Sequence, residues 1–246
     1  TVNQAIVLDN SKYLNKIIEI DEKNLTCIVE PGVVLDELNR QLKPFGLWFP
    51  VDVSTSSRAT IGGMAGNNSA GGRSIRYGIM RDNVLSINTI LSDGSKAHFG
   101  LAKKGLSGLE KVFPKLIKIA ERNQKEIETR YPKVLRRVGG YNLDALLPDT
   151  LASRPGSIGN ETDINLSHLI VGSEGTLAYS TSIELKLSPL PPPKIMALCH
   201  FSTFYEAMDS AQHIVKLDPI AVELIDSTMI SLGRSIPVSY THLTLP

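Results

Sequence analysis

The residues in this sequence with the clearest capacity for chemistry are glycines gathered in one stretch. The segment TIGGMAGNNSAGGRSIRYG, residues 60–78, holds six of the chain's nineteen glycines, together with two adjacent asparagines and two serines. Because glycine has no Cβ, a flat or charged ligand can approach the backbone N–H groups of such a stretch closely. Phosphate groups and ring carbonyls are the natural ligands of this kind of backbone.

Two common nucleotide-binding motifs do not account for the glycine-rich segment. A P-loop needs Gly-Lys-Ser or Gly-Lys-Thr after its glycines, and neither follows here. The dinucleotide fingerprint G-x-G-x-x-G lies directly between a strand and a helix, whereas GGMAG is followed here by NNSAGG. Taken alone, the segment leaves a structural tight turn open as an alternative to a ligand site.

Composition and charge narrow the class of protein. The chain has 246 residues, 42% of them hydrophobic, which is enough to bury a substantial core. Its 26 basic and 25 acidic side chains create no field that would attract nucleic acid. The two cysteines, Cys27 and Cys199, match neither a metal site nor a disulfide framework, which favours a reducing, cytoplasmic setting. No apolar run approaches the roughly 20 residues that span a bilayer.

The elements that must position the glycine-rich segment are a mixture of strands and helices. LTCIVEPG predicts a strand that enters a Pro-Gly turn, and residues 33–46 after it have the apolar spacing of an amphipathic helix. VLSINTILSDGS and KAHFG predict a β-hairpin closed by an Asp-Gly turn. Apolar positions recur at helical spacing over residues 108–131, where we expect Pro114 to bend or shorten the helix.

A proline-rich linker divides the chain. HLIVGSEGTLAYSTSIELKLSP predicts two strands around a glycine turn, and PLPPP follows it. Beyond the linker, KIMALCHF, STFYEAMDSAQHIVK and AVELID predict strand, helix and strand, with a capping box from Thr203 to Glu206 opening the helix. We therefore expect a first domain over residues 1–190, the beginning of a second over 194–237, and a truncated or non-native tail over 238–246.

Six motifs occur in one order along the chain: VEPG, FPVDVS, TIGGMAGNNSAGG, YGIMRDNVLSINTILSDGS, GGYNLDAL and VGSEGTLA. In this order the sequence resembles the FAD-binding oxidoreductases of the vanillyl-alcohol oxidase and p-cresol methylhydroxylase (PCMH) superfamily. Within it, the sequence is most similar to the D-2-hydroxyacid dehydrogenases, which act on D-lactate, glycolate or D-2-hydroxyglutarate. The resemblance implies an α+β fold, in which a PCMH-type FAD-binding domain of two subdomains is followed by the start of an α/β cap domain for the substrate.

The resemblance also implies which residues contact the cofactor. One wall would follow the FPVDVS motif and the glycine-rich segment, and a turn in VGSEGTLA would close on the cofactor from a distant strand. The residues so implied are Pro50, Asp52, Thr60, Ile61, Gly62, Gly63, Asn68, Ser69, Tyr77, Glu174 and Gly175. Backbone amides of the glycine-rich segment would provide the contacts. A packing role stays open for Pro50, Ile61 and Tyr77, as does turn capping for Glu174. We expect most of the nearby arginines, Arg58, Arg73, Arg76 and Arg81, to face solvent.

For the whole protein, the resemblance implies oxidation of a 2-hydroxy acid to the 2-oxo acid, with hydride passing to the flavin. None of the five histidines follows the pattern for covalent flavin attachment or a metal-ligand spacing, so we expect non-covalent FAD and assign no metal. The family's first phosphate-binding loop would precede Thr1, and its substrate-domain histidines would lie beyond residue 246. No catalytic residue is therefore assigned.

The expected partners are the hydroxy acid and an electron acceptor, which would be a quinone, an electron-transfer protein or a fused iron–sulfur domain. We expect no nucleic acid, and a location in the cytoplasm or at the inner face of the membrane. Two alternatives stay open. One is another enzyme on the same fold, such as an aldonolactone or alditol oxidase or an enolpyruvyl reductase. The other is a non-catalytic, flavin-binding electron-transfer subunit.

Overall fold

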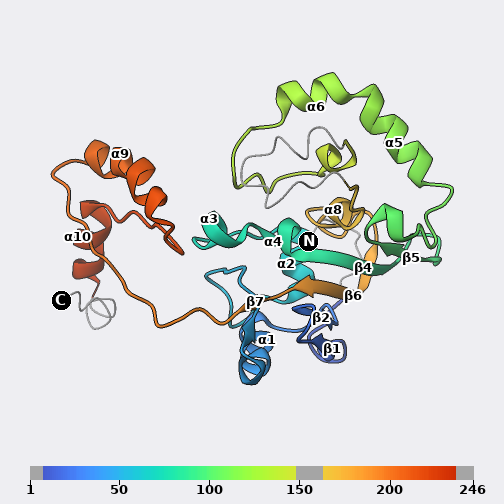
Figure 1. Cartoon of the computed structure of the whole chain (residues 1–246), viewed down its shortest axis with the longest axis horizontal. Coiled ribbons are helices and arrows are strands. Elements are labelled where there is room, and N and C mark those ends of the chain that lie inside the picture. The colour runs from blue at the N-terminus through green and yellow to red at the C-terminus, as the bar shows by residue number, and fades with distance from the viewer. Residues whose placement is uncertain (1–7, 148–162, 237–246) are drawn as a thin grey trace. The chain divides into compact units, whose positions relative to one another are not determined.

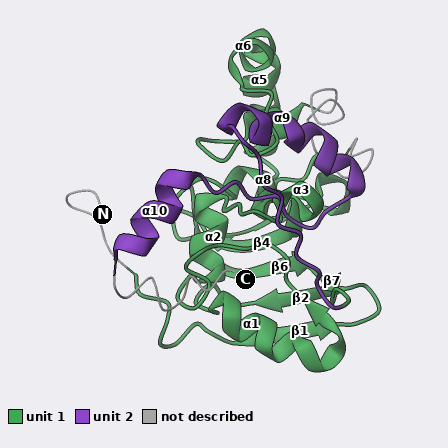
Figure 2. Ribbon diagram, turned by 90° about the vertical axis from the view of Figure 1, so that its left-hand side faces the viewer, with its two compact units in different colours: residues 1–192 green, residues 193–246 purple. Residues whose placement is uncertain are grey.

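A computed structural model of the chain describes residues 8–147 and 163–236 (Figure 1). The chain divides into two compact units, residues 1–192 and 193–246, which Figure 2 colours separately. Helices and antiparallel sheet both occur, which confirms the α+β class predicted from the sequence. The tail predicted over 238–246 lies outside the described residues.

The first unit is built on a five-stranded antiparallel sheet with the order β1-β2-β6-β4-β5 (Figure 1). Its strands are β1 (Ile17–Asp21), β2 (Thr26–Val29), β4 (Val84–Ile90), β5 (Lys96–Phe99) and β6 (Tyr179–Lys186). The buried residues of β2 and β6 alternate, as the period of two in a strand requires, whereas register shifts in β4 interrupt the alternation there. The fully buried members are Cys27, Val29, Val84, Ile87, Ile183 and Leu185.

The helix predicted after the first Pro-Gly turn is present as α1 (Leu35–Leu42). Its three leucines at positions i, i+3 and i+7 are buried, so the apolar stripe read from the sequence faces the core. A short 3-10 helix, η1 (Lys43–Phe45), ends at a glycine in the left-handed conformation and leads into β3 (Leu47–Trp48). β3 pairs with β7 (Ser188–Pro189) in a separate two-stranded sheet.

The predicted hairpin is confirmed, because β4 and β5 pair antiparallel around a turn in which Gly94 has a φ of 81°. The helical stretch expected over 108–131 is present as two shorter helices, α5 (Phe113–Arg122) and α6 (Gln124–Arg130). Pro114 lies in the first turn of α5. It therefore marks the start of the helix, where a missing N–H costs nothing, and it introduces no bend.

Short helices make up most of the rest of this unit, and one of them corrects a prediction. They are α2 (Ile61–Asn67), α3 (Ser74–Tyr77), α4 (Met80–Asn83), η2 (Ala102–Lys104), η3 (Leu143–Leu146) and α8 (Ser167–Ile170). The run HLIV was predicted as a strand, but most of it lies in α8. Asn165 Oδ1 accepts a hydrogen bond from the Ser167 amide and satisfies a donor at the start of this turn. A short buried apolar run suits either structure, so its pattern alone could not decide.

The second unit contains α9 (Phe204–Ile214), η4 (Val215–Leu217) and α10 (Ser227–Ser235). The capping box predicted from Thr203 to Glu206 is confirmed. The two predicted strands, at KIMALCHF and AVELID, are wrong, because the described residues of this unit contain no strand. A strand needs a neighbouring strand to pair its N–H and C=O groups, and the described part of this unit offers none.

Two properties of the described residues bear directly on function. No helix within residues 8–147 and 163–236 is long and apolar enough to cross a membrane. The same residues contain no group of three or more His, Cys, Asp or Glu side chains that could hold a metal ion.

Candidate functional site

The glycine-rich segment begins with the first turn of α2, whose N-cap is Thr60. The Thr60 hydroxyl accepts a hydrogen bond from the Gly63 amide at 3.3 Å. The Ile61 amide donates to the Val33 carbonyl and the Gly62 amide to the Pro31 carbonyl, both at 2.8 Å. The start of a helix has unpaired N–H groups that need acceptors, and here the protein supplies them. The sequence predicted that these amides contact a ligand. That prediction is wrong for these three, because each already donates to an acceptor within the protein.

Gly62 is required by close packing. A Cβ added to Gly62 would lie 2.6 Å from the Pro31 Cβ and 2.9 Å from the Pro31 carbonyl oxygen. This contact joins the VEPG and TIGGMAG motifs, so α2 rests directly on the turn that follows β2. The glycine at position 62 follows from this approach of two backbones.

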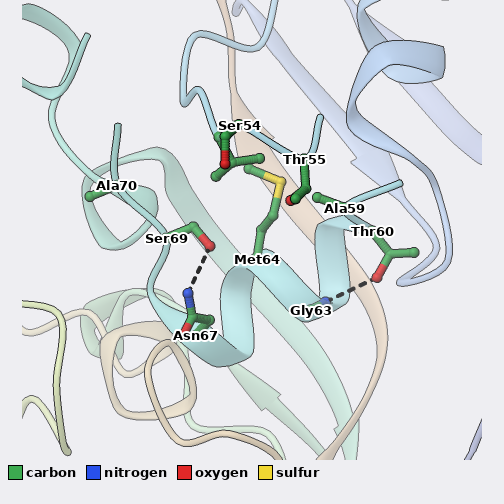
Figure 3. Close-up of a pocket in the computed structure, with 10 residues that line it drawn as sticks. Ser54, Thr55, Ala59, Thr60, Gly63, Met64, Asn67, Ser69 and Ala70 are labelled. Atoms are coloured by element: carbon green, nitrogen blue, oxygen red, sulfur yellow. Dashed lines mark hydrogen bonds between the residues drawn. The ribbon is translucent and has the colours of Figure 1, made fainter. Parts of the chain in front are cut away.

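An open pocket of about 370 Å³ lies along α2 and the loop before it (Figure 3). Three residues predicted from the sequence, Thr60, Gly63 and Ser69, line it. In Figure 3 the Met64 side chain points toward Ser54. The lining residues that the sequence reading missed are Val53, Ser54, Thr55, Ala59, Met64, Asn67 and Ala70. The hydroxyl-rich run STSS that precedes the glycines was the available signal for some of them.

Asp52 is engaged by the far end of the glycine-rich segment. Its Oδ1 accepts a hydrogen bond from the Arg73 amide at 3.2 Å, and its Oδ2 lies 3.9 Å from the Arg73 Nε. A Cβ on Gly71 would lie 2.2 Å from the Asp52 carbonyl oxygen, so only glycine fits there. Asp52 thus fixes the turn that follows the pocket residues Ser69 and Ala70, and it does not itself line the pocket.

Pro50 and Tyr77 also lie behind the pocket. Pro50 is buried. The Tyr77 ring meets the Trp48 ring edge to face, with centroids 5.5 Å apart. The Arg73 guanidinium lies over the same indole, 4.9 Å from the ring centroid, which is the geometry of a cation–π contact. These contacts hold β3, directly before the FPVDVS motif, against α3 and its N-cap Arg73.

The VGSEGT turn docks on the C-terminal end of α2. The Gly172 amide donates to the Ala65 carbonyl and the Glu174 amide donates to the Gly66 carbonyl, both at 2.9 Å. Glu174 has a φ of 51° and Gly175 a φ of 75°, so the turn is built from left-handed backbone. An added Cβ on Gly175 would meet nothing within 4 Å. The structure therefore brings the two motifs together and leaves the tip of the turn accessible.

Two buried polar atoms at this junction have no hydrogen-bond partner among the described residues. They are the Nδ2 of Asn68, whose side chain is 0% exposed, and the Oγ of Ser173, which is 2% exposed. Leaving such a group unpaired costs about 1–3 kcal/mol. The unpaired amide, the hydroxyl and the open Gly175 backbone suit a ligand that carries carbonyl or phosphate oxygens.

An arginine cluster supports the junction from behind, and we define it as Arg81, Arg137, Asn142 and Asp144. Arg81, one of the four arginines of which we expected most to face solvent, is only 1% exposed. Its Nη1 donates to the Asn142 Oδ1 at 2.7 Å and lies 3.4 Å from the Asp144 carboxylate. Arg137 Nη2 lies 2.6 Å from both Asp144 oxygens. Two guanidinium groups therefore share one carboxylate.

The arginine cluster holds backbone from both halves of the junction. The Asn142 Nδ2 donates to the carbonyl of Val171, the first residue of the VGSEGT turn, at 2.8 Å. The Arg81 amide donates to the Asn68 Oδ1 at 3.0 Å, and Asn68 itself has a left-handed φ of 50°. The motifs containing NNS, MRDN, YNLD and VGSEG thus meet at one buried polar network. Their separations in the sequence gave no indication of this.

Residues 1–100 match the family model described as FAD binding domain. The chain is 31% identical to D-2-hydroxyglutarate dehydrogenase of Escherichia coli K12, over 95% of this chain and 23% of that protein. It is 30% identical to a probable mitochondrial D-lactate dehydrogenase of Danio rerio, over 93% of this chain and 36% of the relative. The chain is also 30% identical to the glycolate oxidase subunit GlcD of Bacillus subtilis, over 89% of this chain and 34% of that protein.

Among solved structures, the chain is similar to alkyldihydroxyacetonephosphate synthase in two crystal forms. The TM-scores are 0.50 and 0.51 at 20% identity, over 85% of this chain and 30% or 28% of the synthase chain. At this identity the likeness concerns the fold alone. The chain spans about a quarter to a third of the length of the curated relatives named above.

Proposed function

We propose that this chain holds FAD while a D-2-hydroxy acid is oxidised to the 2-oxo acid. The chain belongs to the FAD-linked oxidoreductases of the vanillyl-alcohol oxidase and PCMH superfamily. The membership predicted from six ordered motifs is confirmed by the FAD binding domain match and the hydroxy-acid dehydrogenase relatives. FAD is accordingly the cofactor. That it is held without a covalent bond, and which acid is oxidised, are parts of the proposal.

The observation that carries the proposal is the docking of the VGSEGT turn on α2. Hydrogen bonds from the Gly172 and Glu174 amides to α2 join two glycine-containing segments that lie far apart in the chain. Beside this junction are an unpaired buried amide at Asn68 and an open backbone at Gly175. These features support a binding site for a cofactor rich in carbonyl and phosphate oxygens.

The predicted residues take two kinds of role in this proposal. Thr60, Gly63 and Ser69 contact the cofactor from the pocket, and Asn68, Glu174 and Gly175 contact it from the junction. Pro50, Asp52, Ile61, Gly62 and Tyr77 act from behind by holding those residues in place. When bound, FAD supplies the acceptor for the two electrons and the hydrogen that leave the substrate carbon.

The substrate class rests on the relatives, whose names specify D-2-hydroxyglutarate, D-lactate or glycolate. Each of these molecules has a hydroxyl group beside a carboxylate. Oxidation of the carbon that bears the hydroxyl yields the 2-oxo acid, and the electrons then pass to an acceptor. We propose a quinone, an electron-transfer protein or an iron–sulfur domain as that acceptor.

The test is to mix the FAD-loaded full-length protein, including the substrate domain expected beyond residue 246, with each D-2-hydroxy acid in the absence of oxygen and to follow the visible flavin absorbance. We expect one of the D acids to bleach the flavin band and its L enantiomer to leave the band unchanged. Bleaching by NADPH but by no hydroxy acid would identify a reductase on the same fold. Bound flavin that none of these donors reduces would point to an electron-transfer subunit, and either result would overturn the proposed reaction.

A further inference from the structure

The basic side chains of this protein are concentrated in one stretch of the sequence. Residues 103–137 contain eleven lysines and arginines against four glutamates, whereas the rest of the chain contains fifteen basic and twenty-one acidic side chains. The formal net charge of +1 therefore combines a strongly positive segment with a negative remainder. Because α5 and α6 lie within this segment, the positive potential is local to this pair of helices.

α5 has an apolar face and a basic face on opposite sides. Its apolar side chains pack on the core of the first unit, and they are Phe113, Leu116, Ile117 and Ala120. Lys115, Lys118 and Arg122 recur at positions i, i+3 and i+7, so they lie on one side of the helix. All three are exposed, as is Lys111 just before the helix. We define the basic face as these four cationic residues.

The basic face has no counter-charge in the part of the chain that the structure describes. No ion pair within residues 8–147 and 163–236 joins any of its four cations to an acidic side chain. Glu121, which borders the basic face, makes no such contact either. On α6, by contrast, the Arg130 Nε lies 2.6 Å from the Glu126 carboxylate. The charges of α5 are therefore available to another molecule.

The position of α5 suits an encounter with a large partner. α5 and α6 stand apart from the five-stranded sheet in both views of the molecule (Figure 1, Figure 2). Both helices pack on η3. Asn142, directly before η3, donates a hydrogen bond to the carbonyl of Val171 in the VGSEGT turn. The basic face is thus supported by the same element that holds one side of the proposed cofactor junction.

The surroundings of the basic face favour a protein over a lipid bilayer or a nucleic acid. Ile119 is 49% exposed and lies four residues after Lys115 and three before Arg122, so an apolar contact is surrounded by charges, as in protein interfaces. The apolar face of α5 is already packed on the core and cannot insert into a bilayer. An extended anionic surface would also repel the negative remainder of the chain.

We infer that the basic face of α5 docks an acidic patch on the surface of a partner protein, with Ile119 as the apolar contact within the interface. In identifying this partner as the protein that accepts electrons from the flavin, the inference rests on the proposed function. Electron-transfer encounters bury little surface, and complementary charge brings such partners together quickly and in one orientation.

Binding of the chain to plant plastocyanin, a one-electron carrier with an acidic patch, tests the docking surface without any need for FAD. We expect calorimetric titration to show binding that weakens steeply between about 0.01 and 0.1 M salt, where the Debye length falls from about 30 to 10 Å. Lys115→Glu combined with Lys118→Glu should weaken binding at low salt by about tenfold or more. Lys115→Arg combined with Lys118→Arg should bind like the wild type.

The matched control is Lys16→Glu combined with Lys23→Glu, which makes the same change in net charge. Both lysines are exposed and flank β1, at the opposite edge of the sheet from β5. This control should bind plastocyanin like the wild type. Absence of binding at low salt, or equal weakening in the two charge-reversal variants, would overturn the inference. Tighter binding to phosphatidylglycerol vesicles than to plastocyanin, lost in the α5 variant, would assign the basic face to a lipid surface instead.

Reoxidation of the flavin tests whether the docked protein is the electron acceptor. The FAD-loaded full-length protein is reduced with light, and each flavin then gives one electron to each of two plastocyanin molecules. We expect the α5 charge reversal to slow this reaction about tenfold and to leave reoxidation by neutral 1,4-benzoquinone unchanged. Equal rates with plastocyanin in the α5 variant and the control would overturn the partner assignment. A chain that binds plastocyanin through α5 but retains no FAD would support the docking surface and contradict the proposed function.

Discussion

The two compact units differ in how far their apolar side chains are buried. In residues 8–192 most of the leucines, isoleucines and valines of the sheet and of α1 pack into one core, with Ile18 and Ile90 as exposed exceptions. In residues 193–236 neither α9 nor α10 has a buried side chain, and Met196 and Leu217 are each 82% exposed. The first unit therefore fixes its own geometry through packing. Residues 193–236 of the second unit have local helical structure, with capping, but contain no buried side chain.

This difference explains why the polar groups of the candidate site are held in fixed positions in the first unit. The pocket along α2, the VGSEGT turn and the arginine cluster all rest on elements whose apolar faces are buried. Packing at that density holds polar groups in place within a few tenths of an ångström, which a binding site requires. The following predictions test this contrast, in order of decreasing effect.

The largest effect should come from truncating matched leucines in the two units. Leu38 lies in α1 and is 0% exposed. Leu38→Ala should lower the unfolding free energy by about 3 kcal/mol, because the truncated side chain leaves a cavity. Leu217→Ala should change it by less than about 0.5 kcal/mol, since its side chain already faces water. Urea unfolding followed by circular dichroism measures both. Equal losses in the two variants would show that the second unit has a core.

Two neighbouring glycines of α2 should respond differently to the same substitution. Gly62→Ala places a methyl group 2.6 Å from the Pro31 Cβ and should lower the unfolding free energy by about 2 kcal/mol. Gly63→Ala has only the flexible Thr60 Oγ1 within 3.1 Å, and the helix propensity of alanine offsets that contact. Thermal unfolding of the two variants should therefore differ by several degrees. Similar melting temperatures would contradict the packing assigned to the VEPG turn.

At neutral pH the smallest predicted effect concerns the two cysteines, one in each unit, because it develops only above about pH 9. Burial, aided by the Glu184 carboxylate, raises the pKa of Cys27 from 9.0 to about 12. Above pH 9 the unfolded chain loses this proton while the folded chain keeps it, so stability falls as pH rises from about 9 to 12. Within that range the wild type should lose up to about 1.4 kcal/mol per pH unit more than Cys27→Ala does.

Urea unfolding at several pH values measures this loss, with Cys199→Ser as the control because Cys199 is exposed. Its pH dependence should follow the wild type. Parallel curves for Cys27→Ala and the wild type would show that Cys27 is not shielded by the sheet.

The parts of the fold that the sequence predicted are those set by short-range patterns. The spacing of Leu35, Leu38 and Leu42 was enough for α1, and the Asp-Gly turn with its alternating neighbours was enough for the β4–β5 hairpin. Both depend on residues within a few positions of one another. The strands expected at KIMALCHF and AVELID were wrong because a strand is completed only by a partner elsewhere.

The candidate site was predictable in its residue types and not in its contacts. The glycines of α2 and the VGSEGT turn stood out, but the pairing of Ile61 and Gly62 with Val33 and Pro31 was not visible. Arg81 shows the limit most clearly. Its partners Asn142 and Asp144 lie 61 and 63 residues away, so nothing near Arg81 in the sequence marks it as buried.

The most direct test of the central claim is the visible spectrum of the purified chain after incubation with FAD and removal of free cofactor. If the junction of α2 with the VGSEGT turn holds FAD without a covalent bond, flavin bands should remain at close to one FAD per chain. The flavin should then leave the protein on denaturation. A chain that is folded by circular dichroism yet retains no flavin would contradict the account.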